Sequence, residues 1–571
     1  MKKILPAMLV LGLLLVVSCA QAPITNPTAQ PPNTAALAGQ PTSAPTSAAA
    51  PTTAPSAPSG ANKVFRRAAF EPDSLDPSKG GPGFQEFQNL YEPLVDAYAQ
   101  DGQIHPLAAE SYKISDDGLT VTFTLRDGLK WSDGKPVVAE DFRYAWLRQL
   151  DPKTASYVPD EFYAIKNGAE FNQGKITDPN QVGIQAPDDK TLVVTLAAPA
   201  PYWLRYVGTT DYVPVRKDII EKYGDKWMEA GNFVGNGPYM LQEWKHDQSM
   251  VFVRNPNYNG PWKDSIKIDR LEFKLVQDPD SQGLPAYEAN EVDAATIPAT
   301  ELDRIKADAK MSKEIHTIPS AGTTILIFDT KNKPTDDVRV RQALSMAIDR
   351  EALANQVLKG GYLAPTSFSP RTLASYNPST FQGYNPEKAK QLLADAGYPG
   401  GKGFPTLELY SWNVQRALLE TQAIKAMWKD TLGIDVNLNP LDPKAMRDWR
   451  IARKDQPFNV YYAWEVAGIL DPIEYHNAQL DPEQNVRNSR YADSQYVQLI
   501  RDAKKETDPA KRAKMYQDAE AIINRDVPII PITEDENFWV VKPNVMNFDQ
   551  VTTALTNFIR AAQPPGLDIS Q

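Results

Sequence analysis

The chain has 571 residues, 42% of them hydrophobic, and a formal net charge of -11 at pH 7. Nucleic acids and anionic lipid surfaces are bound through basic faces, so this acidic composition argues against both as partners. The chain has one cysteine and cannot form an intramolecular disulfide. A protein of this length can instead bury a large apolar core.

The N-terminal segment predicts export. Met1-Lys2-Lys3 is positively charged, and Ile4 to Val17 is an apolar run too short to span a bilayer of roughly 30 Å comfortably. Val16-Val17-Ser18-Cys19 resembles the lipobox of bacterial lipoproteins, in which the thiol is acylated and the chain is cut just before it. We therefore expect a signal peptide over 1–18 and a lipid on Cys19. The alternative is a secretory signal with an incidental cysteine.

The segment that follows predicts a tether. From Ala20 to Asn62 the chain is almost entirely Ala, Pro, Thr, Ser, Gln and Asn, without a charged residue. Such a composition cannot bury enough apolar area to offset its ordering entropy, so residues 19–62 are expected to be disordered. No later apolar run approaches transmembrane length, so we expect a soluble portion from residue 63 onward.

The remaining chain shows strand and helix signals in alternation, which become regular after about residue 323. Alternating apolar and polar residues predict strands, and capping residues with helical apolar spacing predict helices. Asn385 and Asp508 are the expected helix caps, and Gly397 is the expected stop for the first of these helices. The expected strands are 119–126, 191–196, 323–328 and 434–438, and the expected helices are 336–359, 386–396, 414–432 and one opening at 508. This alternation is typical of an α/β lobe.

The sequence contains no standard catalytic motif. It has no Gly-x-Ser-x-Gly elbow, no His-Glu-x-x-His, no phosphate-binding loop and no paired Cys-x-x-Cys. The glycine clusters at 80–83 and 399–403 lack the strand-to-helix setting of a phosphate site, and we interpret them as turns. The histidines lack metal-ligand spacing; they are His105, His246, His316 and His476. We therefore predict a protein that is not an enzyme and that has no metal and no cofactor.

Many short strings, in order along the chain, resemble the large solute-binding proteins of the oligopeptide, dipeptide and nickel ABC transporter family. The most specific is Phe123 to Gly134, which contains Arg126-Asp127-Gly128 and Trp131-Ser132-Asp133-Gly134. Others are Ser74 to Pro77, Leu90 to Val95, His105 to Tyr112, Val234 to Tyr239, Arg254 to Tyr258, Asp337 to Leu344, Ala389 to Tyr398 and Ile529 to Pro531. The resemblance runs from about residue 63 almost to the C-terminus.

This resemblance implies an α/β bilobal fold of the type II periplasmic-binding-protein kind with an additional domain. The expected boundaries are 63–107, 226–322 and 535–571 for lobe I, 108–225 for the additional domain and 323–534 for lobe II. Two crossing segments are expected near Thr323–Asp329 and Pro531–Asn537. A cleft between closing lobes is a common ligand site, and an extended peptide can be held there through its backbone.

The expected ligand site departs from the family pattern. Oligopeptide-binding members often hold the ligand's amino group with an Asp three residues after a Trp. In the matching stretch, Tyr461 to Pro472, Trp464 is present, but Ala467 stands where that Asp is expected. Glu465 is a candidate replacement, because a carboxylate forms a strong hydrogen bond with an ammonium group; the alternative is a solvated loop carboxylate. Tyr462 and Asp471, in the same stretch, complete this set of candidates.

Two further segments supply candidates. Tyr91 and Glu92 match a segment that lies near the cleft in relatives, although Pro93 replaces a common Gly and removes a backbone donor. Glu534 and Asp535 belong to the acidic run Thr533–Asn537. We expect this run on the solvated surface; if it faced the cleft, it would favour a cationic ligand.

Three functions are compatible with these features. The leading hypothesis is a lipid-anchored ABC-transporter protein that binds oligopeptides and meets permease subunits as a monomer. The second is capture of a non-peptide solute, such as a sugar, an opine-like compound or a chelated metal, by the same fold. The third is an anchored hydrolase, against which the missing nucleophile and metal motifs count.

Overall fold

The computed structural model describes residues 63–79, 87–99, 101–452, 457–480, 489–552 and 559–570. The chain divides into two units, Met1–Gly60 and Ala61–Gln571, and all described residues belong to the second. The predicted signal peptide, Cys19, the tether and the glycine cluster 80–83 lie outside the described residues. In the described ranges, no helix is both long and apolar enough to cross a membrane.

A mixed sheet connects two lobes, with the strand order β15-β14-β16-β12-β17-β11-β1-β10-β9-β8. The lobe I strands are β1 (Val64–Ala69), β8 (Tyr239–Lys245), β9 (Ser249–Arg254), β10 (Arg270–Leu275) and β11 (Ala294–Thr296). The lobe II strands are β14 (Leu407–Trp412), β15 (Val436–Leu441) and β16 (Val460–Val466), and β13 (Tyr362–Leu363) pairs with β17.

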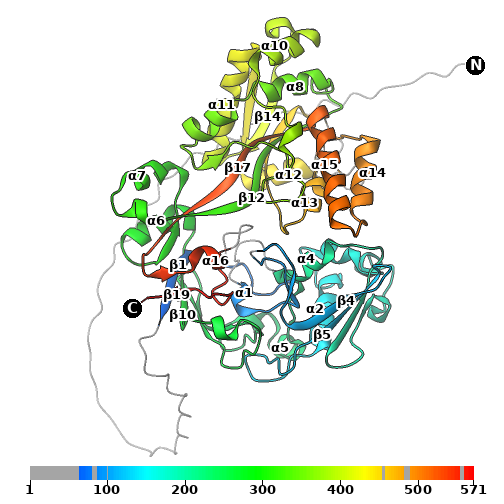
Figure 1. Ribbon diagram of the computed structural model, residues 1–571, viewed down its shortest axis with the longest axis vertical. Coiled ribbons are helices and arrows are strands. Elements are labelled where there is room, and N and C mark those ends of the chain that lie inside the picture. Colours follow the sequence, from blue (N-terminus) through cyan, green and yellow to red (C-terminus); the bar gives the residue numbers. More distant parts are fainter. Residues whose placement is uncertain are drawn as a thin grey trace, which may run out of the picture. The chain divides into compact units, whose positions relative to one another are not determined.

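Two long antiparallel strands, β12 (Ile315–Phe328) and β17 (Ile529–Val541), join the lobes (Figure 1). β17 pairs with β11 of lobe I near its C-terminal end, and β12 pairs with β16 of lobe II from Gly322 to Phe328. The register between β12 and β17 shifts between Pro319 and Thr323. Such an irregularity bends a strand pair locally, so the two strands change direction between the lobes. The expected crossing Pro531–Asn537 lies within β17, whereas the expected Thr323–Asp329 overlaps only the lobe II part of β12 and ends one residue beyond that strand.

A smaller antiparallel sheet, β4-β5-β7-β6, lies within residues 108–225, the segment expected to form the additional domain and called the small domain below. Its strands are β4 (Ala109–Ile114), β5 (Thr120–Leu125), β6 (Ile184–Gln185) and β7 (Thr191–Thr195). Its helices are α2 (Ala139–Leu150), α3 (Gly168–Asn172), α4 (Trp203–Val207) and α5 (Lys217–Tyr223). Buried side chains on α2, Phe142 and Trp146 among them, join the same core as the inward residues of β5 and β7.

The remaining helices and short strands belong to the two lobes. Those of lobe I are α1 (Phe87–Leu90), α6 (Pro279–Glu288), α7 (Leu302–Ala307), α16 (Phe548–Val551) and the short strands β2 (Val95–Asp96), β3 (His105–Pro106), β18 (Val545–Met546) and β19 (Asp568–Ile569). Those of lobe II are α8 (Val338–Met346), α9 (Arg350–Ala352), α10 (Pro386–Asp395), α11 (Gln415–Leu432), α12 (Pro443–Ala452), α13 (Pro472–Leu480), α14 (Ser494–Ala503) and α15 (Pro509–Asp526).

Lobe I and the small domain share one hydrophobic core, whereas the sheet of lobe II has a separate hydrophobic cluster on each of its two faces. The shared cluster includes Phe65 of β1, Trp146 of α2 and Trp539 of β17. In lobe II, alternate residues of β12 enter two clusters on opposite faces of the sheet: Ile325 in one and Leu326 in the other. This is the side-chain alternation expected of a strand covered on both faces.

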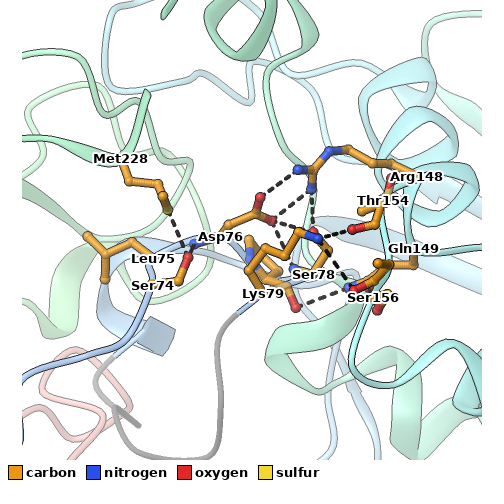
Figure 2. A network of polar contacts seen from close by, with 12 residues as sticks. Ser74, Leu75, Asp76, Ser78, Lys79, Arg148, Gln149, Thr154, Ser156 and Met228 are labelled. Atoms are coloured by element: carbon orange, nitrogen blue, oxygen red, sulfur yellow. Dashed lines mark hydrogen bonds and ion pairs between the residues drawn. The ribbon is translucent and has the colours of Figure 1, made fainter. Parts of the chain in front are cut away.

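A buried ion pair ties the start of lobe I to the small domain (Figure 2). Both oxygens of the Asp76 carboxylate accept hydrogen bonds from Arg148 of α2, at 2.7 and 2.5 Å. The hydroxyl and amide of Ser78 also donate to Asp76, at 2.8 and 2.9 Å. A bidentate guanidinium–carboxylate pair fixes both position and orientation. Through Asp76, the Ser74 to Pro77 string therefore joins the start of lobe I to α2 of the small domain.

Several expected elements are confirmed, and one is wrong. α10 begins after Asn385, whose side chain accepts a hydrogen bond from the amide of Lys388, and α15 begins after Asp508 in the same way. The single helix expected over 336–359 is instead divided into α8, α9 and a π-helical turn at Leu353–Val357. α8 ends at Met346, and Asp349 caps a new turn by accepting from the amide of Ala352 at 2.9 Å.

The buried carboxyl group of Glu520 on α15 holds a loop of lobe II. It accepts hydrogen bonds from the hydroxyl of Ser367 and from the amides of Phe368, at 2.9 Å, and Ser369, at 3.3 Å. Burial raises the pKa of Glu520 to about 7, although these hydrogen bonds act in the opposite direction. The folded protein therefore retains a proton that the unfolded chain releases near the ordinary glutamate pKa.

This difference predicts that stability falls as pH rises. Below about pH 4.5 both states hold the proton, and between about pH 4.5 and 7 only the folded state does, so unfolding becomes easier by roughly 3 kcal/mol. In Glu520→Gln, this part of the pH dependence should be absent. Urea unfolding from pH 4.5 to 8 measures it, with the exposed Glu387→Gln as the control. An unchanged pH profile in Glu520→Gln would contradict the assignment.

Candidate interlobe binding site

A cavity of about 440 Å³ lies between the lobes, beside the β17 crossing strand. Its volume falls in the range of about 300–1,000 Å³ that is usual for small-ligand sites. The lobe I wall comes from Asp280 and residues 296–300. The lobe II and crossing-strand walls come from Leu358, Gly361, Tyr362, Trp412, residues 414–416, Leu419, Tyr462, Trp464 and residues 535–538.

Two aromatic side chains of β16, Tyr462 and Trp464, line this cavity. They are two residues apart on a strand and therefore project from the same face. The Trp464 side chain is 53% exposed, although its Nε1 donates a hydrogen bond to Asp535 Oδ2 at 2.6 Å. The indole is thus held in position at one end, and much of its surface remains available for a ligand.

A buried charged network supports these aromatic residues. Arg416, near the start of α11, lies 2.8 Å from Asp535 Oδ1 and donates to Glu420 Oε1 at 3.4 Å. The hydroxyl of Tyr462 donates to Glu420 Oε2 at 2.5 Å, and Thr533 Oγ1 donates to Glu420 Oε1 at 2.6 Å. The network joins α11, β16 and β17 through side chains. Its geometry therefore fixes both aromatic residues relative to the crossing strand.

The charges in this network stabilise one another. Burial alone would lower the pKa of Arg416, but the nearby charges of Asp535 and Glu420 raise it well above its usual value. Burial, and then the charge of Glu420, raises the pKa of Tyr462 as well. Arg416 remains a cation and Tyr462 a neutral hydrogen-bond donor over the physiological pH range.

The glycine at position 322 permits the close approach of Asp535. A Cβ atom at Gly322 would lie 2.3 Å from Asp535 Oδ2, far inside van der Waals contact. Gly322 is also the first β12 residue paired with β16. The position where the lobes meet therefore requires a residue without a side chain.

The acidic run at 533–537 is buried in its first half, and the expectation that it lies on the solvated surface is wrong. Thr533, Glu534 and Asp535 are at most 7% exposed, because β17 lies inside the sheet between β12 and β11. Glu534 accepts hydrogen bonds from the amide and Nε of Arg371, at 3.1 and 3.0 Å. Asp535 and Glu536, but not Glu534, line the cavity.

Glu465 and Asp471 do not line the cavity. Glu465 follows Trp464 on the strand and projects from the opposite face; its carbonyl accepts a hydrogen bond from the Tyr475 hydroxyl at 3.1 Å. It is 8% exposed, so the alternative of a solvated loop carboxylate is wrong. Asp471 is buried and forms a bidentate pair with Arg512 of α15, at 2.7 and 2.6 Å.

Tyr91 and Glu92 lie in the core of lobe I, outside the cavity walls. The Tyr91 hydroxyl donates to the carbonyl of Leu75 at 3.3 Å, and the Glu92 carboxyl accepts from the hydroxyl of Tyr258. Burial raises the pKa of Glu92 to about 7, opposed by the Tyr258 hydrogen bond. In this structure both side chains serve the packing of lobe I.

Two members of the network, Arg416 and Glu420, are absent from the candidates predicted from sequence. A signal was available, because Glu420 falls at helical spacing among the buried residues Ala417, Thr421 and Ile424 of α11. A charged residue within an apolar helix face requires a partner, and an Arg four residues earlier supplies one. Among the described residues, no group of three or more His, Cys, Asp or Glu side chains is placed to hold a metal ion.

The network predicts a large loss of stability when its cation is removed. Arg416→Ala leaves Asp535 and Glu420 buried without their counter-charge, which costs about 3–5 kcal/mol. Urea unfolding should show this loss, whereas Lys425→Ala, on the exposed side of the same helix, should unfold like the wild type. Equal stability of Arg416→Ala and the wild type would show that the carboxylates do not depend on Arg416.

Comparison with known proteins gives a consistent result. The model of the family "Bacterial extracellular solute-binding proteins, family 5 Middle" matches residues 103–486. The chain is 30% identical over 499 residues to the oligopeptide-binding protein OppA of Bacillus subtilis, covering 83% of this chain and 88% of the relative. It is 33% identical over 509 residues to the probable deoxycholate-binding periplasmic protein YgiS of Escherichia coli, covering 86% and 92%.

The fold agrees with that of a solved structure. The periplasmic murein tripeptide binding protein MppA, in its unliganded open form, superposes with a TM-score of 0.74 and 29% identity, over 89% of this chain and 98% of that one. The two-lobed α/β architecture is thus that of a known type of binding protein. The chain belongs to family 5 of the bacterial extracellular solute-binding proteins.

Proposed function

We propose that this chain is the substrate-binding lipoprotein of an ABC importer, which captures oligopeptides between its lobes and delivers them to a membrane permease. The observation that carries the proposal is the position of Trp464. Its indole is held by Asp535 and leaves more than half of the side chain exposed in the interlobe cavity. A rigid, partly solvated aromatic surface gains free energy when a ligand covers it.

The composition of the cavity supports a peptide ligand. Aromatic and aliphatic side chains such as Trp412, Val414 and Leu419 provide apolar surface for varied side chains, while β17 contributes the polar residues Asp535, Glu536 and Asn537. The carboxylates of Asp280, Asp535 and Glu536 outnumber the single arginine, Arg416, in the cavity wall. This charge balance favours a ligand that carries an ammonium group and compensates for the missing carboxylate at Ala467.

The N-terminal segment supports delivery at a membrane. A lipid on Cys19 and a tether over 19–62 would hold the binding unit near a permease and raise its local concentration there. The first lobe with its small domain, and the second lobe, would close around the solute before transfer. Monomeric action is part of this proposal.

A second candidate is capture of a non-peptide solute by the same cavity. Ala467 lacks the carboxylate expected for a peptide amino terminus, and one of the relatives described above is named for deoxycholate. The apolar surface around Trp464 would suit such a ligand. This candidate keeps the binding site and changes only the class of solute.

Native mass spectrometry of the purified protein tests the proposal. We expect co-purified peptides of mixed sequence, released on denaturation and sequenced by fragmentation. A single non-peptide species would support the second candidate and contradict the first. Turnover of a bound substrate during incubation would show that the chain is a hydrolase.

Trp464→Ala should weaken binding of the co-purified ligands by about tenfold or more, as expected for loss of an aromatic anchor. Its unfolding midpoint should change little, since the side chain is half exposed. Calorimetric titration measures the affinity. Phe70→Ala, at an aromatic residue that is 44% exposed and does not line the cavity, is the matched control. Unchanged affinity in Trp464→Ala would remove this residue from the site.

A further inference from the structure

A second cavity, of about 370 Å³, lies between the small domain and lobe II. Its small-domain wall includes the 3-10 turn Pro159–Ala164 and α4, and its lobe II wall includes the start of α13 and the residues just after α14. It shares no lining residue with the first cavity.

A side-chain hydrogen bond between Tyr206 and Glu474 crosses this boundary. The hydroxyl of Tyr206 on α4 donates to Oε1 of Glu474 on α13, and the amide of Gly468 donates to the other oxygen of Glu474 at 3.4 Å. Tyr202 and Tyr206 also pack against the hydrophobic cluster of lobe II. α4 is therefore docked on lobe II by both apolar and polar contacts.

The groups facing this hydrogen bond carry an excess of acid. Glu161 Oε2 is buried and accepts no hydrogen bond from a described residue. Asp211 accepts from Tyr157 at 2.5 Å, and Asp471 is paired with Arg512. The titratable and charged groups around the contact come from both sides of the boundary. The small domain contributes Tyr157, Asp160, Glu161, Tyr163, Tyr202, Arg205 and Asp211, and lobe II contributes Asp471, Lys504, Lys505 and Arg512.

We propose that the Tyr206–Glu474 contact is a latch for lobe closure, and that closing it takes up protons. With the latch closed, Glu474 of lobe II and Glu161 of the small domain line one cavity, and both are partly buried. Two carboxylates in such a place are costly to ionise together, so the closed form favours protonation. The inference rests on the proposed function, in which the lobes open and close around a solute.

The electrostatics of the arrangement in which Tyr206 contacts Glu474 agree with this inference. Burial, followed by the charges of Asp211, Glu474 and Asp160, raises the pKa of Glu161. Burial also raises the pKa of Glu474, against the lowering effect of the Tyr206 hydrogen bond, and raises that of Asp211 to about 6. In an open form Glu474 would separate from Glu161 and Tyr206, and its pKa would return toward the ordinary value, whereas the partners of Asp211, Tyr157 and Thr209, lie in the small domain on either side of closure. The closed form is therefore favoured at acid pH, and this advantage is lost as pH rises through the raised pKa values.

Fluorescence energy transfer in the ligand-free full chain tests the latch. Dyes on Lys175→Cys of the small domain and Lys425→Cys of lobe II, both in a Cys19→Ser background, report the closed-to-open ratio. Between pH 5 and pH 8 this ratio should fall about tenfold or more, the effect of one unit of pKa difference. In Glu474→Gln the ratio should fall less steeply than in the parent, because this carboxyl no longer exchanges a proton. Glu221→Gln, an exposed carboxylate of α5, should behave like the parent.

Tyr206→Phe removes the hydrogen bond to Glu474 but keeps the Glu474 carboxyl that exchanges the proton. It should lower the closed population at both pH values and keep the pH dependence. A pH-independent ratio in the parent, an unchanged slope in Glu474→Gln or an unchanged population in Tyr206→Phe would each overturn the latch. The measurement uses no ligand, so these outcomes are independent of whether mass spectrometry finds peptides.

Discussion

The ion pair between Arg416 and Asp535 is the interaction on which the site depends. It joins a helix of lobe II to the strand that crosses between the lobes, and Asp535 in turn orients Trp464. Burying the Arg416 cation and the carboxylates of Asp535 and Glu420 is tolerated only while each charge keeps its partner of opposite sign. The cavity wall, the crossing strand and the helix start are therefore coupled, and a change at Gly322 would be transmitted to the indole through Asp535.

The sequence predicted the fold well where local signals were strong. Asn385 and Asp508 identified two helix starts, because capping depends on neighbours within one turn. The division of 336–359 into shorter segments was missed, since the cap at Asp349 lies inside a continuous helical apolar pattern. The family resemblance supplied the order of the parts, which periodicity alone does not contain.

The site was predicted less completely, for a physical reason. Trp464, Tyr462 and Asp535 were among the candidates, and the structure brings these three together around one cavity. Runs of charged residues usually lie on the solvated surface, so the sequence predicts an exposed acidic run at 533–537. In the structure its first three residues are buried, because β17 lies inside the sheet. Local patterns do not show which face of β16 carries Glu465, because that depends on pairing with the distant strand β12. They also do not show that Asp471 pairs with Arg512, which is far away in the sequence.

The core shared by lobe I and the small domain has a mechanical consequence. With the Asp76–Arg148 ion pair, it joins the two parts into one rigid unit, and if the lobes close as proposed, the irregular pairing of β12 and β17 is the expected hinge. Along a rigid unit, displacement grows with distance from the hinge. A slight bend at the crossing strands would thus be amplified where α4 meets lobe II. In the proposed closure, a hydrogen bond at that distance from the hinge would oppose opening with a larger turning moment than the same bond beside the hinge.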